Sequence, residues 1–149
     1  MLDLYAGTGA LGIEALSRGA REAQFVEGSR MVARALRENL ARLGLAERGT
    51  VHEADLSLAD LPAGVDGPFD LVFLDPPYAG DAGARWLERL GRMAWSATRP
   101  GLVIHERRKG ALAMAMPGFE IATERTYSET TVTFYRASKD AKRERKGDA

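Results

Sequence analysis

The sequence contains no cysteine among its 149 residues. Without thiols the chain can form neither a disulfide framework nor a thiolate metal site, and it cannot use a cysteine nucleophile. It also lacks any apolar run near the roughly 20 residues that a membrane-spanning helix needs. Its first residues have neither the basic flank nor the long apolar stretch of a secretory signal. We therefore expect a cytoplasmic protein with no membrane partner.

An excess of charge of one sign is also absent, because 21 Lys and Arg balance 21 Asp and Glu. Proteins that bind nucleic acid usually carry a basic patch or stripe, and net charge gives no sign of one here. Basic residues cluster only at 107–109 and in 139–146, and solvated surface charge explains both clusters equally well. The composition, 45% hydrophobic and 28% charged, is typical of a soluble globular domain.

Short β-rich runs alternate along the chain with stretches of helical periodicity. Apolar residues recur at helical spacing in 29–43, where Ser29 can cap the start and Gly44 suits the end. The run 69–74 is almost continuously apolar, as parallel strands covered on both faces are. This alternation predicts an α/β, Rossmann-like fold with a mostly parallel twisted sheet and helices on both faces. We expect strands at 2–5, 23–27, 50–54, 69–74 and 102–105, and helices at 11–18, 29–43 and 86–94.

The end of the chain has a different pattern. Two β-rich runs, 119–127 and 130–136, are separated only by Ser128 and Glu129. This spacing predicts an antiparallel hairpin added to the parallel sheet. Residues 137–149 are rich in charge without apolar periodicity, which predicts a disordered tail after one folded domain over 1–136. Trp86 and Trp95 are most simply interpreted as core or helix-packing residues.

A glycine-rich segment joins the first expected strand to the first expected helix. It reads Asp-Leu-Tyr-Ala-Gly-Thr-Gly-Ala-Leu-Gly from Asp3 to Gly12. Gly7 and Gly9 permit a tight turn and let a ligand approach the backbone closely. Glu27 follows Gly7 by twenty residues, at the end of the second expected strand. A carboxylate at that place commonly accepts hydrogen bonds from ribose hydroxyls, so the pair indicates a cofactor that contains adenosine.

Two such cofactors compete, a nicotinamide dinucleotide and S-adenosylmethionine. A dinucleotide places its pyrophosphate at the helix N-terminus, whereas S-adenosylmethionine carries an ammonium and a sulfonium and no phosphate. Asp3, at the entrance of the loop, suits the cationic cofactor better, although a loop-organising carboxylate explains it as well. Asp55, after the third expected strand, is placed to accept from an adenine amine, or is simply a turn residue.

The segment Asp75-Pro76-Pro77-Tyr78 follows the fourth expected strand. In a doubly wound sheet, ligands bind beyond the carboxyl ends of the strands, so these residues border the expected cofactor site. An exocyclic base amine is a poor nucleophile, because its lone pair is delocalised into the ring. The Asp75 carboxylate and the Pro76 carbonyl can accept its two N–H bonds, in a turn that the prolines keep stiff. Tyr78 offers a ring on which a flipped base can stack.

The block from Leu2 to Ala20 closely resembles the first motif of RsmD-like methyltransferases: Leu-Asp-Leu-Tyr-Ala-Gly-Thr-Gly-Ala-Leu-Gly-Ile-Glu-Ala-Leu-Ser-Arg-Gly-Ala. Further similar blocks follow in the order of the family, at 25–27, 39–40, 69–78 and 127–135. The similarity covers residues 1–136, and the first block together with the Asp-Pro-Pro-Tyr block makes it specific.

Members of that family methylate the N2 amine of a guanine in 16S ribosomal RNA, with S-adenosylmethionine as methyl donor. The resemblance implies a methyltransferase core over 1–136 whose partner is ribosomal RNA or the small ribosomal subunit, and a monomer is our default. It implies that Gly7, Gly9, Glu27 and Asp55 line the cofactor pocket, and that Asp75, Pro76 and Tyr78 hold the guanine.

Three departures from the family pattern stand out. The family has several dozen residues before the first strand, including a basic segment, and we expect that this part is missing here. Gly28 follows Glu27 where the family usually has a polar or charged residue, a change that can loosen contacts to adenosine. Ser128 stands where glycine is usual, which affects the geometry of the hairpin turn.

Alternative functions remain open at this point. The Asp-Pro-Pro-Tyr chemistry suits adenine N6 or a protein glutamine amide equally well, and only the resemblance selects guanine. A chain without its N-terminal segment can be an inactive binding module, and a dinucleotide-dependent oxidoreductase is a third class. His52 and His105 have no spacing that suggests a metal site. Glu106 ends the fifth expected strand and can border the site, but the sequence assigns it no role.

Overall fold

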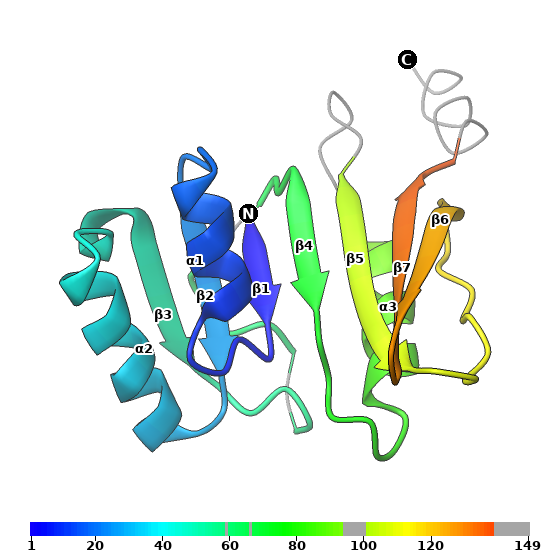
Figure 1. Ribbon diagram of the computed structural model, residues 1–149, viewed down its shortest axis with the longest axis horizontal. Helices are drawn as coiled ribbons and strands as arrows, with labels where there is room; N and C mark the ends of the chain where they lie inside the picture. Colours follow the sequence, from blue (N-terminus) through cyan, green and yellow to red (C-terminus); the bar gives the residue numbers. More distant parts are fainter. Residues whose placement is uncertain (59, 66, 94–100, 139–149) are drawn as a thin grey trace. The chain divides into compact units, whose positions relative to one another are not determined.

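The structure is a computed structural model, and it describes residues 1–58, 60–65, 67–93 and 101–138. The chain divides into two compact units, Met1–Asp66 and the part from Gly67 onward. Figure 1 traces the course of the chain through both units. Each unit is described by itself below.

The first unit consists of three parallel strands with two helices on one face (Figure 1). Each helix crosses from one strand to the next parallel strand, as a parallel sheet requires. The hydrogen-bonded strand order is β3-β2-β1. The elements in chain order are β1 (Leu2–Leu4), α1 (Ala10–Ser17), β2 (Ala23–Glu27), α2 (Arg30–Arg42), the short 3-10 helix η1 (Ala46–Arg48) and β3 (Gly49–Glu53).

The core of this unit forms around Phe25, the central residue of β2, which is fully buried. Leu16 of α1 and Leu36 and Leu40 of α2 belong to the same buried cluster. Ser29 caps α2 as expected, with its hydroxyl accepting from the Val32 amide at 3.5 Å. Buried leucines of both helices thus pack with Phe25 of β2.

The second unit contains four strands in the order β4-β5-β7-β6 and one described helix. β4 and β5 are parallel, whereas β7 runs antiparallel to both β5 and β6. Helix α3 buries Trp86, Leu87 and Leu90. The elements are β4 (Leu71–Leu74), α3 (Ala82–Arg92), β5 (Leu102–Arg108), β6 (Phe119–Tyr127) and β7 (Thr130–Ala137).

The expected C-terminal hairpin is confirmed, and its turn has a specific feature. Ser128 adopts a φ of 49°, in the left-handed region that favours glycine. Strand β6 lies at the edge of the sheet and is exposed along nearly its whole length, with a register shift between Ile121 and Thr123. The hairpin therefore forms despite the serine, and among the residues that the structure describes no strand pairs with the outer edge of β6. We call this the free edge of β6.

Most element boundaries differ from the expected ones by a few residues. The largest difference is the start of α3, which lies at Ala82, four residues before the expected helix. β5 continues to Arg108 because its end pairs with β7, Arg108 opposite Thr130. β7 includes Ala137, one residue beyond the domain boundary expected from the sequence. Trp86 is buried as expected, at 1% exposure. Trp95 and residues 139–149, where we expect the tail, lie outside the described residues.

Within the described ranges, none of the helices combines the length and the apolarity that crossing a bilayer requires.

Gly12→Ala tests the close packing of α1 on the strands. A Cβ atom at Gly12 would lie 2.2 Å from Cε1 of Phe25 and 2.9 Å from Oδ2 of Asp3. We expect a loss of about 2 kcal/mol in the free energy of unfolding, because overpacking outweighs the better helix propensity of alanine. Chemical denaturation measures this loss, with the exposed Ser17→Ala as control in the same helix. A Gly12→Ala protein as stable as wild type would contradict the packing.

Candidate functional site

The loop between β1 and α1 is shaped by two glycines with positive φ, 55° at Gly7 and 89° at Gly9. A Cβ atom at Gly9 would lie 2.1 Å from Cδ1 of Leu36, so this glycine is required by packing. A Cβ atom at Gly7 would have no heavy atom within 4 Å. The backbone at Gly7 is therefore open, and a ligand can approach it closely.

Glu27 ends β2 and holds this loop in place. Its Oε2 accepts from the Gly7 amide at 2.9 Å, and its Oε1 accepts from the Ser29 amide at 2.7 Å. A carboxylate offers about four lone-pair positions, so both oxygens can accept further hydrogen bonds. The side chain is half-buried. Glu27 is thus a positioned acceptor pair beside the open backbone of Gly7, as the sequence spacing predicts.

Asp55 follows the neighbouring strand β3 and is exposed. Its Oδ1 accepts from the Ser57 hydroxyl at 2.6 Å and from the Ser57 amide at 2.8 Å. These two hydrogen bonds lower the pKa of Asp55 below its ordinary value. A Cβ atom at Gly28 would lie 3.3 Å from Cα of Asp55. The glycine after Glu27 thus lets the chain after β2 pass close to Asp55, a packing reason for this departure from the family pattern.

Asp3 lies beneath the loop and is only 1% exposed. Its Oδ2 accepts from the Gly12 amide at 2.9 Å, which joins β1 to the first half of α1. The loop-organising role considered for Asp3 has direct support in this bond, and a contact with a cofactor stays a prediction. Asn39 of α2 lies in the family block at 39–40, and no role was predicted for it. It also supports the loop, by donating to the Thr8 carbonyl at 3.1 Å.

In the second unit, Asp75 follows β4 next to Glu106 of β5. The strands pair Leu74 with His105, so the residues after these two are neighbours at the carboxyl end. Burial, and then the negative charge of Glu106, raise the pKa of Asp75 to about 6. The group is still mainly a carboxylate at neutral pH, and as such it is a strong hydrogen-bond acceptor. Pro76 beside it is buried and has no N–H to compete for the carboxylate.

The hydroxyl of Tyr78 is held from two strands. It donates to Oε1 of Glu106 at 2.9 Å and lies 2.9 Å from Oγ1 of Thr130 at the start of β7. The residue is nevertheless 52% exposed. Tyr78 therefore has its polar end fixed and part of its surface free, which suits the stacking role predicted for it. Thr130 lies in the family block at 127–135, but no role was predicted for it. Glu106 was singled out by its place at the end of the expected strand, although β5 in fact continues to Arg108.

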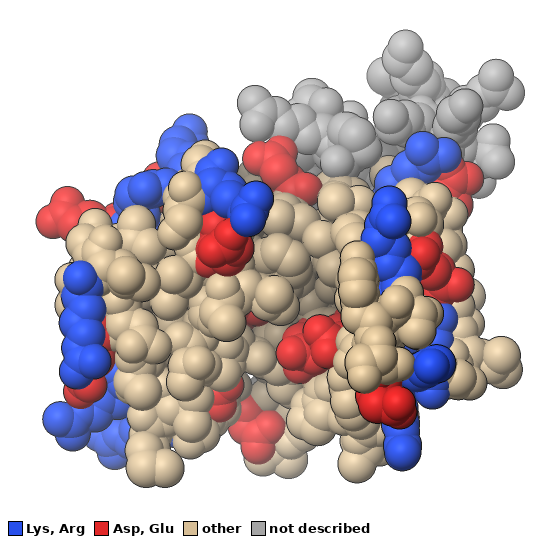
Figure 2. Space-filling model, viewed as in Figure 1, with Lys and Arg blue, Asp and Glu red and all other residues tan. Residues whose placement is uncertain are grey.

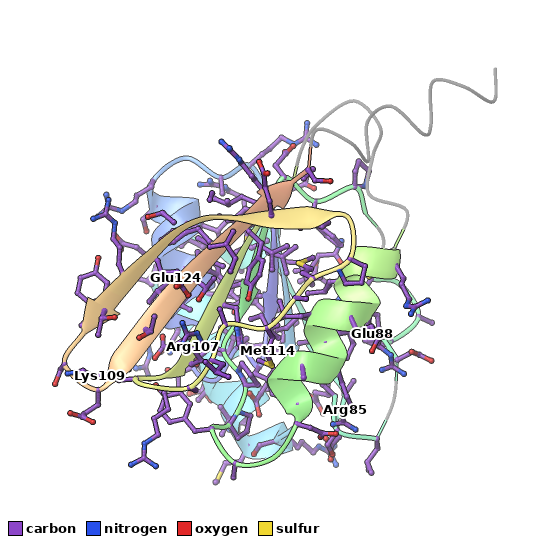
Figure 3. The ribbon with its side chains drawn as sticks, turned by 90° about the vertical axis from the view of Figure 1, so that its right-hand side faces the viewer. Arg85, Glu88, Arg107, Lys109, Met114 and Glu124 are labelled. Carbon is purple, nitrogen blue, oxygen red and sulfur yellow. The ribbon has the colours of Figure 1, made fainter. Side chains whose placement is uncertain are left out.

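A second polar cluster of the same unit lies on the other side of β5, because side chains alternate along a strand. Arg107 donates to Oε1 of Glu124 at 2.6 Å and to Oγ1 of Thr133 at 3.3 Å, and also to the Ala111 carbonyl (Figure 3). Arg107 is buried, so its interpretation as solvated surface charge is wrong. Burial, and then the charge of Arg107, lower the pKa of His105 to about 4. This cluster supports the hairpin.

The surface charges in Figure 2 show Lys and Arg interleaved with Asp and Glu. On α2 Arg34 pairs with Glu38 at 3.2 Å, and on the hairpin Arg136 pairs with Glu120 at 2.9 Å. Exposed pairs of this kind contribute little stability. In the part of the chain that the structure describes, no group of three or more His, Asp or Glu could hold a metal ion.

Asp75→Asn tests how much the ionised Asp75 carboxylate lowers the free energy of unfolding. The raised pKa of Asp75 means that its protonated form stabilises the fold below about pH 4, and that this contribution is lost as the pH rises through about 6. We expect Asp75→Asn to raise the free energy of unfolding by about 2 kcal/mol near pH 7.5 and by far less near pH 4.

Denaturant titrations at the two pH values measure this difference. Asp55→Asn is the control of opposite sign, since hydrogen bonds from Ser57 lower the pKa of that carboxyl. An Asp75→Asn protein whose stability changes with pH as the wild type does would contradict the assigned pKa.

The sequence is similar to those of known proteins. The model of the family described as conserved hypothetical protein 95 matches residues 1–136. Ribosomal RNA small subunit methyltransferase D of Escherichia coli strain K12 is 28% identical over 134 residues, which are 90% of this chain and 66% of the relative. The chain thus spans just under two thirds of that relative's length.

Solved structures agree with this match. A conserved hypothetical protein of Streptococcus pyogenes is 31% identical, with a TM-score of 0.79 over 92% of this chain and 84% of that one. An RNA methyltransferase of Salinibacter ruber in complex with S-adenosyl-L-homocysteine has a TM-score of 0.68 at 17% identity, over 93% of this chain and 80% of that one, and it shows the fold alone. The Rossmann-like methyltransferase fold expected from the sequence is confirmed. The chain belongs to the conserved hypothetical protein 95 family, the RsmD-like family that its motifs resemble.

Proposed function

We propose that this protein transfers a methyl group from S-adenosylmethionine to the N2 amine of a guanine in small-subunit ribosomal RNA. The observation that carries the proposal is the site in the second unit, where Asp75 and Pro76 follow β4 and Tyr78 is tethered beside them. The family match and the function named for the Escherichia coli relative support the choice of ribosomal RNA. The proposed partner is this RNA or the small ribosomal subunit.

The residues of the first unit fit the adenosine part of the cofactor. Glu27 keeps lone pairs available for ribose hydroxyls, and Asp55 has its Oδ2 available for an amine. The open backbone of Gly7 gives the ligand room beside Glu27. The acceptors match a ligand rich in donors. When bound, S-adenosylmethionine supplies an activated methyl group on a positively charged sulfur.

The residues of the second unit suit an amine that has to be made nucleophilic. The Asp75 carboxylate and the Pro76 carbonyl can accept the two N–H bonds, which favours a pyramidal nitrogen with its lone pair free for attack. With S-adenosylmethionine bound, this nitrogen would be placed to take the methyl group from the sulfur, and one of its N–H protons would pass to the solvent. Positioning supplies most of the rate enhancement in such a transfer. No strong general base is required, because the amine becomes acidic as it is methylated.

Other planar amines, adenine N6 or a protein glutamine, fit Asp75 and Pro76 alone equally well. Modified-base analysis of RNA from a deletion strain separates these possibilities. Loss of one N2-methylguanine supports the proposal, and an unchanged content of this base would contradict it. The alternative of an inactive binding module predicts cofactor or RNA binding without methyl transfer.

Glu27→Gln tests the cofactor site. We expect the wild type to bind S-adenosylhomocysteine in a calorimetric titration, and the variant to bind at least roughly tenfold more weakly, because charge-assisted hydrogen bonds to ribose are lost. Glu22→Gln, an exposed change just before β2, is the matched control. Circular dichroism shows whether each variant is folded. Equal affinity in Glu27→Gln would remove Glu27 from the site, and tight binding of NADH without S-adenosylhomocysteine would reverse the cofactor assignment.

The rate of methyl transfer tests the role of Asp75. Only the carboxylate form of Asp75 accepts the hydrogen bond from the amine at full strength. With a pKa of about 6, we expect the rate to rise about tenfold between pH 5 and pH 7. Asp75→Asn should lower the rate by about 100-fold or more and flatten this profile, with binding of S-adenosylhomocysteine unchanged. Incorporation of labelled methyl groups into unmodified ribosomal RNA measures both effects. A profile that stays pH-dependent in the variant would assign the titration to another group.

A further inference from the structure

Glu106 stands directly beside the proposed amine-binding residues. It is one residue beyond the last β4–β5 pair, Leu74 with His105, and it therefore lies level with Asp75. Its charge acts on Asp75. Its Oε1 accepts from the Tyr78 hydroxyl at 2.9 Å. The Asp75 and Glu106 carboxylates and the Tyr78 hydroxyl thus gather where β4 ends.

The second oxygen of Glu106 is available. Among the residues that the structure describes, no side chain donates to Oε2 of Glu106, and neither Glu106 nor Asp75 forms an ion pair. Two neighbouring carboxylates without a cation repel each other, and this arrangement is costly unless donors are brought to it. A ligand that presents two adjacent donor groups would offset that cost.

We propose that Glu106 is a specificity-determining residue that accepts the N1–H of guanine, while Asp75 and Pro76 accept the neighbouring N2 amine. This inference rests on the proposed methyl transfer and identifies which amine the site selects.

The chemistry of the candidate amines supports this choice. In guanine the exocyclic amine lies next to a ring N–H donor. In adenine and cytosine the ring nitrogen beside the amine is an acceptor, and in glutamine the neighbour is a carbonyl oxygen. A carboxylate that faces an acceptor gains no hydrogen bond and repels its lone pair. Glu106 therefore favours guanine over each of the other amines that Asp75 and Pro76 alone would accept.

Tyr78 has a part in this arrangement. Its hydroxyl, near Oγ1 of Thr130 at 2.9 Å, occupies Oε1 of Glu106 and so fixes the direction of the carboxylate. Glu106 and Thr130 lie on strands β5 and β7, which pair through Arg108 and Thr130 and through Glu106 and Val132. The alternative role for Glu106, an anchor for the Tyr78 ring and nothing more, makes a different prediction.

The experiment compares guanine with 2-aminopurine, which keeps the 2-amine but has an acceptor at N1. The guanine that the wild-type full chain methylates is first mapped on an unmodified small-subunit ribosomal RNA transcript. A ligated transcript then carries 2-aminopurine at that position. The measured quantity is the ratio of kcat/KM for the two transcripts, in wild type, Glu106→Gln and Glu106→Ala. Glu120→Gln on β6 is the matched control, and Tyr78→Phe tests the anchor role.

We expect the wild type and Glu120→Gln to prefer guanine by roughly tenfold or more, and both Glu106 variants to lose most of this preference. Tyr78→Phe should slow both transcripts and keep a clear preference. If the Glu106 variants keep the wild-type ratio, or if Tyr78→Phe loses the ratio as fully as they do, the inference is overturned while the proposed function stands. If the wild type methylates no guanine of the transcript, the proposed function itself fails, and the inference fails with it.

Discussion

The hydrogen bond between the Gly12 amide and the buried Asp3 carboxylate sets the geometry of the whole first unit. It holds α1 so close to β1 and β2 that no side chain fits between the helix and Phe25. With the helix at this depth, the loop before it must turn sharply, which Gly7 and Gly9 allow through positive φ. The Gly7 amide then meets the carboxylate of Glu27, and the edge of the unit where we propose that the cofactor binds follows from these contacts.

The second unit depends on a different constraint, the parallel register in which β4 ends at Leu74 while β5 continues past His105, the partner of Leu74. β4 and β5 bring Asp75 and Glu106 to the same place, and burial, together with the charge of Glu106, raises the pKa of Asp75. A site that holds two like charges close together is less stable than its neutral counterpart, and such strain is typical of sites selected for function. The tethered Tyr78 hydroxyl offsets part of the cost by donating to one of the two carboxylates.

Much of this arrangement could be predicted from local sequence, and the remainder depends on strand pairing. The position of Glu27 could be predicted because its distance from Gly7 in sequence is set by one strand–helix–strand crossover. Asp75, Pro76 and Tyr78 are contiguous and follow an apolar run. By contrast, the contact of Tyr78 with Thr130 joins residues 52 positions apart in sequence, through a hairpin register that no local pattern determines. The burial of Arg107 was misjudged for the same reason, because its partners Glu124 and Thr133 come from the two strands of that hairpin.

The free edge of β6 has a consequence for the behaviour of the protein at high concentration. An unpaired edge strand offers its backbone groups to any other extended chain, and it is a common starting point for aggregation. Here the shift of register between Ile121 and Thr123 interrupts the regular ladder, and charged side chains such as Glu120 and Arg125 stand along the strand. Irregular geometry and charge both disfavour the addition of a further strand. The hairpin that completes the fold thus also carries its own protection against self-association through this edge.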